Sequence, residues 1–291
     1  MRNRKGWMVL LSAVLAAGLY GSALAASDIG GAVQNGKSGG IPMKLTEEAK
    51  QYRENHFEKD PFGLEKEDPE FSVLFSNFAF DEVIRESRLD DRTRSLAVLA
   101  SLMGCQGEEA FRTAAAGALK SGVTPEELKE AVYQGTAYLG MGRVLPFVHI
   151  LNDVLKEQGV QLPLPEGGTV SADTRIEAGN QAQVDIFGEQ MRGFQNSGPE
   201  ESRHINRWLA GNCFGDYYTR KGLDYRQREL ITFCFLAAQG GCEPQLISHA
   251  AANMRIGNSR EFLIDVVSQC LPYIGYPRSL NALRCINEAA K

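Results

Sequence analysis

A thiol, an amide and an imidazole follow one another at helical spacing in the second half of the sequence. They are Cys242, Gln245 and His249, and Pro244 lies between them. Because proline favours the first turn of a helix, we expect Cys242 at or near the N-cap, where the helix dipole lowers the pKa of a thiol. Seven residues span nearly two turns, so Cys242 and His249 share a face but lie roughly 10 Å apart. Gln245 is the residue in reach of His249, and it is a candidate substrate contact.

A carboxylate on the preceding predicted helix can complete this group. Glu229 can contact His249 across the helix pair, and a Glu–His pair holds an imidazole in one tautomer and tunes its basicity. Arg226, Arg228 and Arg278 are candidates to hold a substrate carboxylate, and the alternative for the first two is a solvated or intersubunit ion pair. The residues therefore predict proton-transfer chemistry on a small anionic molecule, with a reactive thiol as a second possibility.

Helices must position these residues, because strand signals are scarce throughout the chain. Thr124-Pro125-Glu126-Glu127 has the pattern of a capping box with proline at the first helical position, and Gly122 ends the helix before it. The helix that begins with this capping box runs to about Tyr138. The other predicted helical segments are 44–58, 71–89, 93–103, 111–120 and one that follows Gly140 and ends near Glu157.

The second half repeats the order of the first with a period of about 135 residues. Leu89-Asp90-Asp91-Arg92-Thr93-Arg94 corresponds to Leu223-Asp224-Tyr225-Arg226-Gln227-Arg228, and Tyr138-Leu139-Gly140 corresponds to Tyr273-Ile274-Gly275. The predicted fold class is all-α, as two tandem helical domains. The predicted boundaries are a signal peptide at 1–25, a flexible linker at 26–43, a first domain at 44–157, a linker at 158–179 and a second domain at 180–291.

The first 25 residues are typical of a secretory signal peptide, so we expect an exported protein that is periplasmic or secreted and has no membrane segment after cleavage. An uncleaved anchor is the alternative, because the apolar span approaches bilayer length. The pattern consists of a basic start, an apolar stretch and small residues at the cleavage site: Arg2, Arg4 and Lys5, then Trp7 to Tyr20, then Ala23-Leu24-Ala25.

Composition narrows the partners and cofactors. The chain has 291 residues and a net charge of -5, with acidic and basic residues interleaved, which gives no electrostatic reason to expect nucleic acid. Four scattered histidines give no metal signature, and we expect no cofactor. Most of the six cysteines are expected to be buried small hydrophobes, although export permits one disulfide.

The second half resembles the carboxymuconolactone decarboxylase-like family, which includes the alkyl hydroperoxidase D proteins. The resemblance rests on Arg226-Gln227-Arg228-Glu229-Leu230, on the run from Gly240 to His249, and on the run from Tyr273 to Leu283. It implies a compact helical fold that assembles into trimers or hexamers, and for a tandem chain a trimer is our expectation.

The resemblance also implies roles for single residues. Cys242 matches the first thiol of the hydroperoxidase branch, His249 matches its histidine and Glu229 its relay glutamate, but Gln245 replaces the second thiol. In the first half, Ser95 stands in the place of Glu229 and Ala114 in the place of His249, so that copy is expected to be structural.

Three functions remain open on the sequence. The first is a cofactor-free, decarboxylase-type enzyme that acts on a small lactone or carboxylic acid with His249 and Glu229. The second is a thiol peroxidase in which Cys242 is oxidised to a sulfenic acid and resolved by an external thiol. The third is a helical assembly module without catalytic activity.

Overall fold

The computed structural model describes residues 43–57 and 60–291, and their regular structure is helical throughout. The signal-peptide prediction and nearly all of the 26–43 linker lie outside the described residues. Within the described ranges, no helix is both long enough and apolar enough to span a bilayer. The first repeat contains α1 Glu47–His56, α2 Pro69–Asn77, α3 Val83–Arg85, α4 Asp91–Cys105, α5 Glu108–Lys120, α6 Pro125–Leu139 and α7 Met141–Glu157, with a π-helical segment η1 Phe78–Glu82.

The second repeat follows the same plan, which confirms the all-α tandem fold. It contains α8 Arg175–Phe187, α9 Arg203–Trp208, the π-helical segment η4 Leu209–Tyr218, α10 Tyr225–Gln239, α11 Glu243–Arg255 and α12 Arg260–Ala289, with 3₁₀ turns η2 Glu189–Met191 and η3 Phe194–Asn196. Helix α12 is two helices joined at Gly275, whose φ of 77° breaks the helix where Gly140 separates α6 from α7.

Local sequence explains where several helices begin and end. Thr124 and Glu127 form the predicted capping box of α6, and Asp224 and Gln227 form a second one at α10. The segment predicted as one helix over 71–89 is different, because it begins at Pro69, passes through η1 and ends at Arg85. The chain then leaves the helix so that Asp90 can cap α4.

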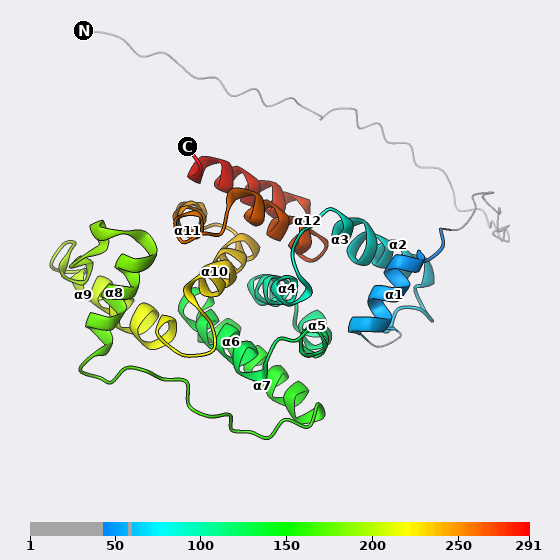
Figure 1. The fold of residues 1–291 in the computed structure, drawn as a ribbon, viewed down its shortest axis with the longest axis horizontal. Coiled ribbons are helices and arrows are strands. Elements are labelled where there is room, and N and C mark those ends of the chain that lie inside the picture. Colours follow the sequence, from blue (N-terminus) through cyan, green and yellow to red (C-terminus); the bar gives the residue numbers. More distant parts are fainter. Residues whose placement is uncertain (1–42, 58–59) are drawn as a thin grey trace, which may run out of the picture. The chain divides into compact units, whose positions relative to one another are not determined.

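The two repeats share one hydrophobic core. In Figure 1, α4 and α10 lie side by side, between the group α1–α3 and the pair α8 and α9. A Cβ added to Gly104 on α4 would lie 2.7 Å from the Cβ of Ala238 on α10, so the glycine permits the close approach of the two helices. The predicted boundaries of the two domains stay a prediction, since both halves contribute to this core.

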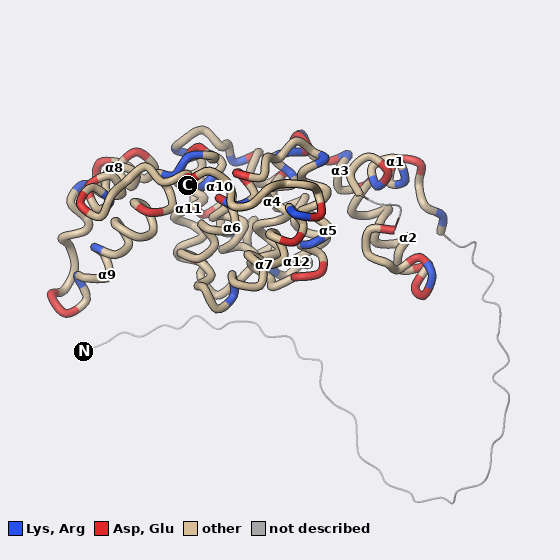
Figure 2. Tube along the Cα trace, turned by 90° about the horizontal axis from the view of Figure 1, so that it is seen from below, with Lys and Arg blue, Asp and Glu red and all other residues tan. Residues whose placement is uncertain are grey.

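Charges and cysteines follow the expected distribution. Acidic and basic residues are interspersed along the described helices (Figure 2). All six cysteines are free, and four of them are buried, so most are small hydrophobes as predicted and the permitted disulfide does not form. Tyr273 packs against Phe75, whereas Tyr276, three residues on, is largely exposed.

Replacing Gly104 by alanine is expected to destabilise the protein. The added methyl group has no space between α4 and α10, and overpacking of this kind costs about 1–3 kcal/mol. Gly142→Ala is the matched control, because no atom lies within 4 Å of the added Cβ there, and alanine is expected to leave stability unchanged or raise it by about 0.5–1 kcal/mol. Urea unfolding measures both, and equal stabilities would show that α4 and α10 do not pack this closely.

Candidate functional site

The imidazole of His249 and the carboxylate of Glu229 form a direct pair between α11 and α10. Nδ1 of His249 lies 2.7 Å from Oε2 of Glu229, as the sequence predicted for this helix pair. Glu229 is fully buried and His249 is 8% exposed. Because the carboxylate only accepts, Nδ1 carries the proton, and Nε2 is the nitrogen with a lone pair when the ring is neutral.

Tyr218, at the end of η4, supplies the second hydrogen bond to this carboxylate. Its hydroxyl donates to Oε1 of Glu229 over 2.8 Å, and the hydroxyl oxygens of Tyr138 and Thr232 lie 2.8 and 2.7 Å from it. A tyrosine hydroxyl has one proton, so Tyr138 and Thr232 must both donate to Tyr218. Burial raises the pKa of Tyr138 and of Tyr218 well above the ordinary value, which keeps both protonated. The hydrogen bonds therefore all run towards Glu229.

Tyr138 comes from the first repeat, so both repeats build the site. Its ring meets the ring of His249 edge to face at a centroid distance of 5.5 Å, and Phe187 of α8 does the same from another side at 5.3 Å. Within the described residues, Nε2 of His249 makes no hydrogen bond. The imidazole is held in a fixed orientation, with one nitrogen bound and the other unengaged.

Neither tyrosine was predicted from the sequence. Tyr138 stands out there only as part of the repeat, and Tyr218 lies in a π-helical segment with no motif of its own. The signal that could have found Tyr138 is its correspondence to Tyr273, which places a tyrosine from each repeat at the site of the other.

Arg228 is buried among internal partners, contrary to the prediction that it contacts a substrate carboxylate. It is fully buried, and burial lowers its pKa despite the neighbouring carboxylate of Glu130. Its guanidinium donates to Oε1 of Gln134 over 3.0 Å and to Oε2 of Glu130 over 3.1 Å. Gln134 in turn donates to Thr232, which joins this ion pair to the tyrosine network. The physical reason for the error is that these internal partners use the guanidinium.

Among the described residues, none of the other predicted substrate contacts forms a hydrogen bond with the imidazole. Arg226 is exposed and donates to Asn258 and to the backbone of Gly257, so it ties α10 to the loop before α12. Arg278 is half-buried beside Gly240 and makes no ion pair among the described residues. Gln245 is exposed on the first turn of α11 and makes no hydrogen bond to His249 there. Of these three, the structure leaves Arg278 and Gln245 with unused polar groups.

Cys242 is the N-cap of α11, as predicted, but its pKa is not lowered. Burial raises the pKa of this thiol and outweighs the hydrogen bond from Gln239, which lowers it. The Sγ atom donates to the carbonyl of Leu236 over 3.5 Å. The expected lowering of the pKa of Cys242 is therefore wrong, because desolvation by burial has the largest effect on this thiol and raises its pKa.

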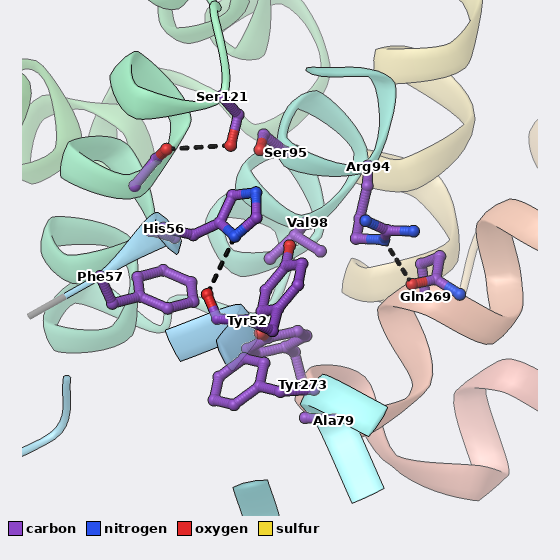
Figure 3. Close-up of a pocket in the computed structure, with 13 residues that line it drawn as sticks. Tyr52, His56, Phe57, Ala79, Arg94, Ser95, Val98, Ser121, Gln269 and Tyr273 are labelled. Atoms are coloured by element: carbon purple, nitrogen blue, oxygen red, sulfur yellow. Dashed lines mark hydrogen bonds between the residues drawn. The ribbon is translucent and has the colours of Figure 1, made fainter. Parts of the chain in front are cut away.

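The corresponding place in the first repeat is filled by side chains of α1. Ser95 and Ala114 line a cavity of only about 30 Å³, roughly the volume of one water molecule (Figure 3). His56 lies there, with Nδ1 2.9 Å from the carbonyl of Tyr52 and Nε2 3.1 Å from the carboxylate of Asp91. Nδ1 is thus used within α1, whereas Nε2 ties α1 to α4. This arrangement supports the structural interpretation of the first copy.

The model of the carboxymuconolactone decarboxylase family matches the chain twice, at residues 69–153 and 204–288. Together these matches cover more than half of the chain. The chain belongs to the carboxymuconolactone decarboxylase family. The paired matches also confirm the tandem arrangement, and the second one contains Glu229 and His249.

The chain is also similar to two known proteins. The chain is 29% identical over 107 residues to 4-carboxymuconolactone decarboxylase of Acinetobacter baylyi, a match that covers 37% of this chain and 80% of that protein. A crystal structure from Burkholderia xenovorans LB400, described as that of a candidate gamma-carboxymuconolactone decarboxylase subunit, is 22% identical with a TM-score of 0.48. That match covers 84% of this chain and 97% of the other.

The raised pKa of Cys242 has a direct chemical consequence. At pH 7 the thiolate fraction of Cys242 is expected to be smaller than that of free cysteine, so iodoacetamide should alkylate it more slowly. Peptide mapping by mass spectrometry after timed labelling measures the rate, with the urea-unfolded protein as the reference for full reactivity. Labelling faster than that of free cysteine would mean that the dipole of α11 does govern this thiol.

Proposed function

We propose that the chain is a cofactor-free enzyme of the decarboxylase type that acts on a small lactone or carboxylic acid. The observation that carries the proposal is the His249–Glu229 pair at 2.7 Å, with Nε2 left unengaged. A buried carboxylate that fixes the tautomer of an imidazole and stabilises its protonated form is suited to general acid–base work. The family as a whole is consistent with a small-molecule substrate.

His249 is the proposed catalytic residue, and Glu229 positions it. In a decarboxylation, the carboxylate leaves as carbon dioxide and its bonding electron pair passes to the adjacent carbon, where conjugation with a lactone carbonyl stabilises it. The protonated Nε2 of His249 then gives its proton to that carbon, and water restores the proton to the ring. Glu229 accepts from Nδ1 throughout and stabilises the imidazolium.

Substrate access involves Phe187 in this proposal. His249 is 8% exposed, and the rings of Phe187 and Tyr138 lie against it. Phe187 ends α8 and is only partly buried, and in this proposal its displacement exposes Nε2. Small movements of this kind are common when sites close around ligands. Arg278 and Gln245 stay candidate contacts for a substrate carboxylate.

The thiol peroxidase function is less well supported. A peroxidatic cysteine needs a thiolate, whereas burial raises the pKa of Cys242, and Gln245 stands where a second thiol would be. A helical assembly module without catalytic activity does not account for the buried carboxylate of Glu229 or for the two hydrogen bonds that this carboxylate accepts. We therefore favour proton transfer.

His249→Ala is expected to lower the turnover of 4-carboxymuconolactone by about 100-fold or more, the range that a positioned acid or base contributes. Glu229→Gln is expected to lower it as well, because the amide does not stabilise an imidazolium. The decrease in the absorbance of the lactone measures the rate. Other lactone acids are assayed as substrates in the same way. Cys242→Ser is expected to keep the activity.

His149→Ala is the matched control, since this histidine is exposed on α7. Full activity of the His249 variant would contradict the assignment of His249 as the catalytic residue. Loss of activity in the Cys242 variant alone would favour the thiol peroxidase function.

Export and self-association are part of the same proposal. The basic and apolar pattern of residues 1–25 supports export, and exposed apolar side chains at equivalent positions of the two repeats support a trimer of tandem chains. These side chains lie at the starts of α7 and of the second half of α12: Met141 and Leu145, and Tyr276 and Leu280. Apolar side chains exposed in a chain alone are typical of surfaces buried on assembly.

Expression in a bacterium with a periplasm, followed by native mass spectrometry, tests both parts. We expect a mature chain that begins at Ala26 and a mass of three chains, and Leu280→Glu together with Leu145→Glu is expected to give monomers because buried charges oppose association. A monomer before substitution would refute the trimer, and an intact N-terminus would refute cleavage.

A further inference from the structure

A groove of about 730 Å³ lies on the side of the molecule formed by α6, α7 and the connecting segment that follows α7. This volume is within the range of small-molecule sites. His249 does not line it, so the groove is distinct from the site of the proposed function. Its walls come from α6 and α7, from residues 162–167 and from the loop at 220–222.

A buried lysine lines this groove. Lys129 on α6 is 8% exposed, and its ammonium group donates to Oδ1 of Asn152. Among the described residues it has no carboxylate partner. Burial and the neighbouring ammonium of Lys156 both lower its pKa. A buried charge without a counterion is costly, so a bound anion would stabilise this position.

The surroundings combine cations with an aromatic face. The ammonium of Lys129 lies 5.8 Å from the ring centre of Tyr133, and the guanidinium of Arg220 lies 5.5 Å from it. Arg220 is paired with Glu130 at 2.8 Å, so that carboxylate is already neutralised. The other two carboxylates of the lining, Glu126 and Glu166, are exposed. The buried part of the groove is therefore positively charged.

An apolar wall completes the groove. Residues 162–165 read Leu-Pro-Leu-Pro, and the carbonyl of Gly167 accepts from the amide of Lys221 over 2.9 Å, which fixes this segment against the second repeat. A ligand in the groove would therefore contact cationic side chains in one part and apolar side chains in another. This combination suits an organic anion better than an inorganic one.

The internal duplication provides a comparison within the same chain. The corresponding positions on the first half of α12 carry Ile264 for Lys129, Asp265 for Glu130 and Ser268 for Tyr133. The groove there is lined by three acidic residues and one basic residue, Arg88, together with Ser259 and apolar side chains. The fold therefore does not require a buried lysine or an aromatic ring at this place. The pair of Lys129 and Tyr133 therefore has no counterpart in the second repeat, although Arg220 of the groove comes from that repeat.

We propose that the groove between α6 and α7 binds a small organic dicarboxylate, with Lys129 binding one carboxylate and Lys156 the other. Tyr133 and residues 162–165 cover the apolar body of the ligand. The first repeat, which lacks the histidine and the glutamate of the second, thus carries a binding site of its own.

Isothermal titration calorimetry with phthalate as the probe tests the proposal on the full chain. We expect one phthalate bound per chain, and Lys129→Met is expected to weaken binding by about tenfold or more, because the charge is lost while the apolar stem is kept. Inorganic phosphate is expected to bind more weakly than phthalate, since it has no apolar body. No heat with millimolar phthalate would overturn the proposal, and equal affinity for phosphate would overturn the assignment to an organic anion.

Three variants complete the design. Lys120→Met is the matched control, because Lys120 lies on α5 away from the groove. We expect the Lys120→Met protein to bind phthalate with unchanged affinity. Lys156→Met changes an exposed side chain and should weaken binding in a folded protein, so it decides the matter if Lys129→Met is unstable. The His249→Ala protein is expected to bind phthalate unchanged. Loss of phthalate binding in this variant would show that the heat of binding comes from the site of the proposed function instead.

Discussion

The buried guanidinium of Arg228 constrains the arrangement of both repeats. A buried charge must find its partners inside the protein, and Arg228 finds them on α6 of the other repeat, in Gln134 and Glu130. Arg94 makes the equivalent contact in reverse, donating to Gln269 over 2.7 Å. Removing one partner from such a pair typically costs about 3–5 kcal/mol, so these contacts hold α4, α10, α6 and α12 in one arrangement.

The chemistry of the second site follows from that arrangement. Glu229 is the residue after Arg228 on α10, so the same contacts that fix α10 also fix the carboxylate that holds His249. The docking of α6 brings Tyr138 from the first repeat to the tyrosine of η4, and the hydroxyl protons then run towards Glu229. A single repeat lacks this tyrosine and could not build the site alone.

The sequence predicted the local features well and the long-range ones poorly. The capping box at Thr124, the N-cap at Cys242 and the contact of Glu229 with His249 follow from spacing along one or two neighbouring helices. The roles of Tyr218 and Arg228, the partner of His56 and the raised pKa of Cys242 depend on which surfaces meet and how much water is excluded. Spacing does not encode burial, and burial decided each of these cases.

Joining the two repeats in one chain has an evolutionary consequence. In a dimer of identical subunits, every substitution occurs twice, and both halves must tolerate it. In this chain Gly107 occupies the position that corresponds to Cys242, and α1 fills the cavity of the first repeat while Phe187 of α8 borders the imidazole of His249. Covalent linkage thus releases each half from the symmetry of its ancestor, and one half can acquire a different task without damaging the other.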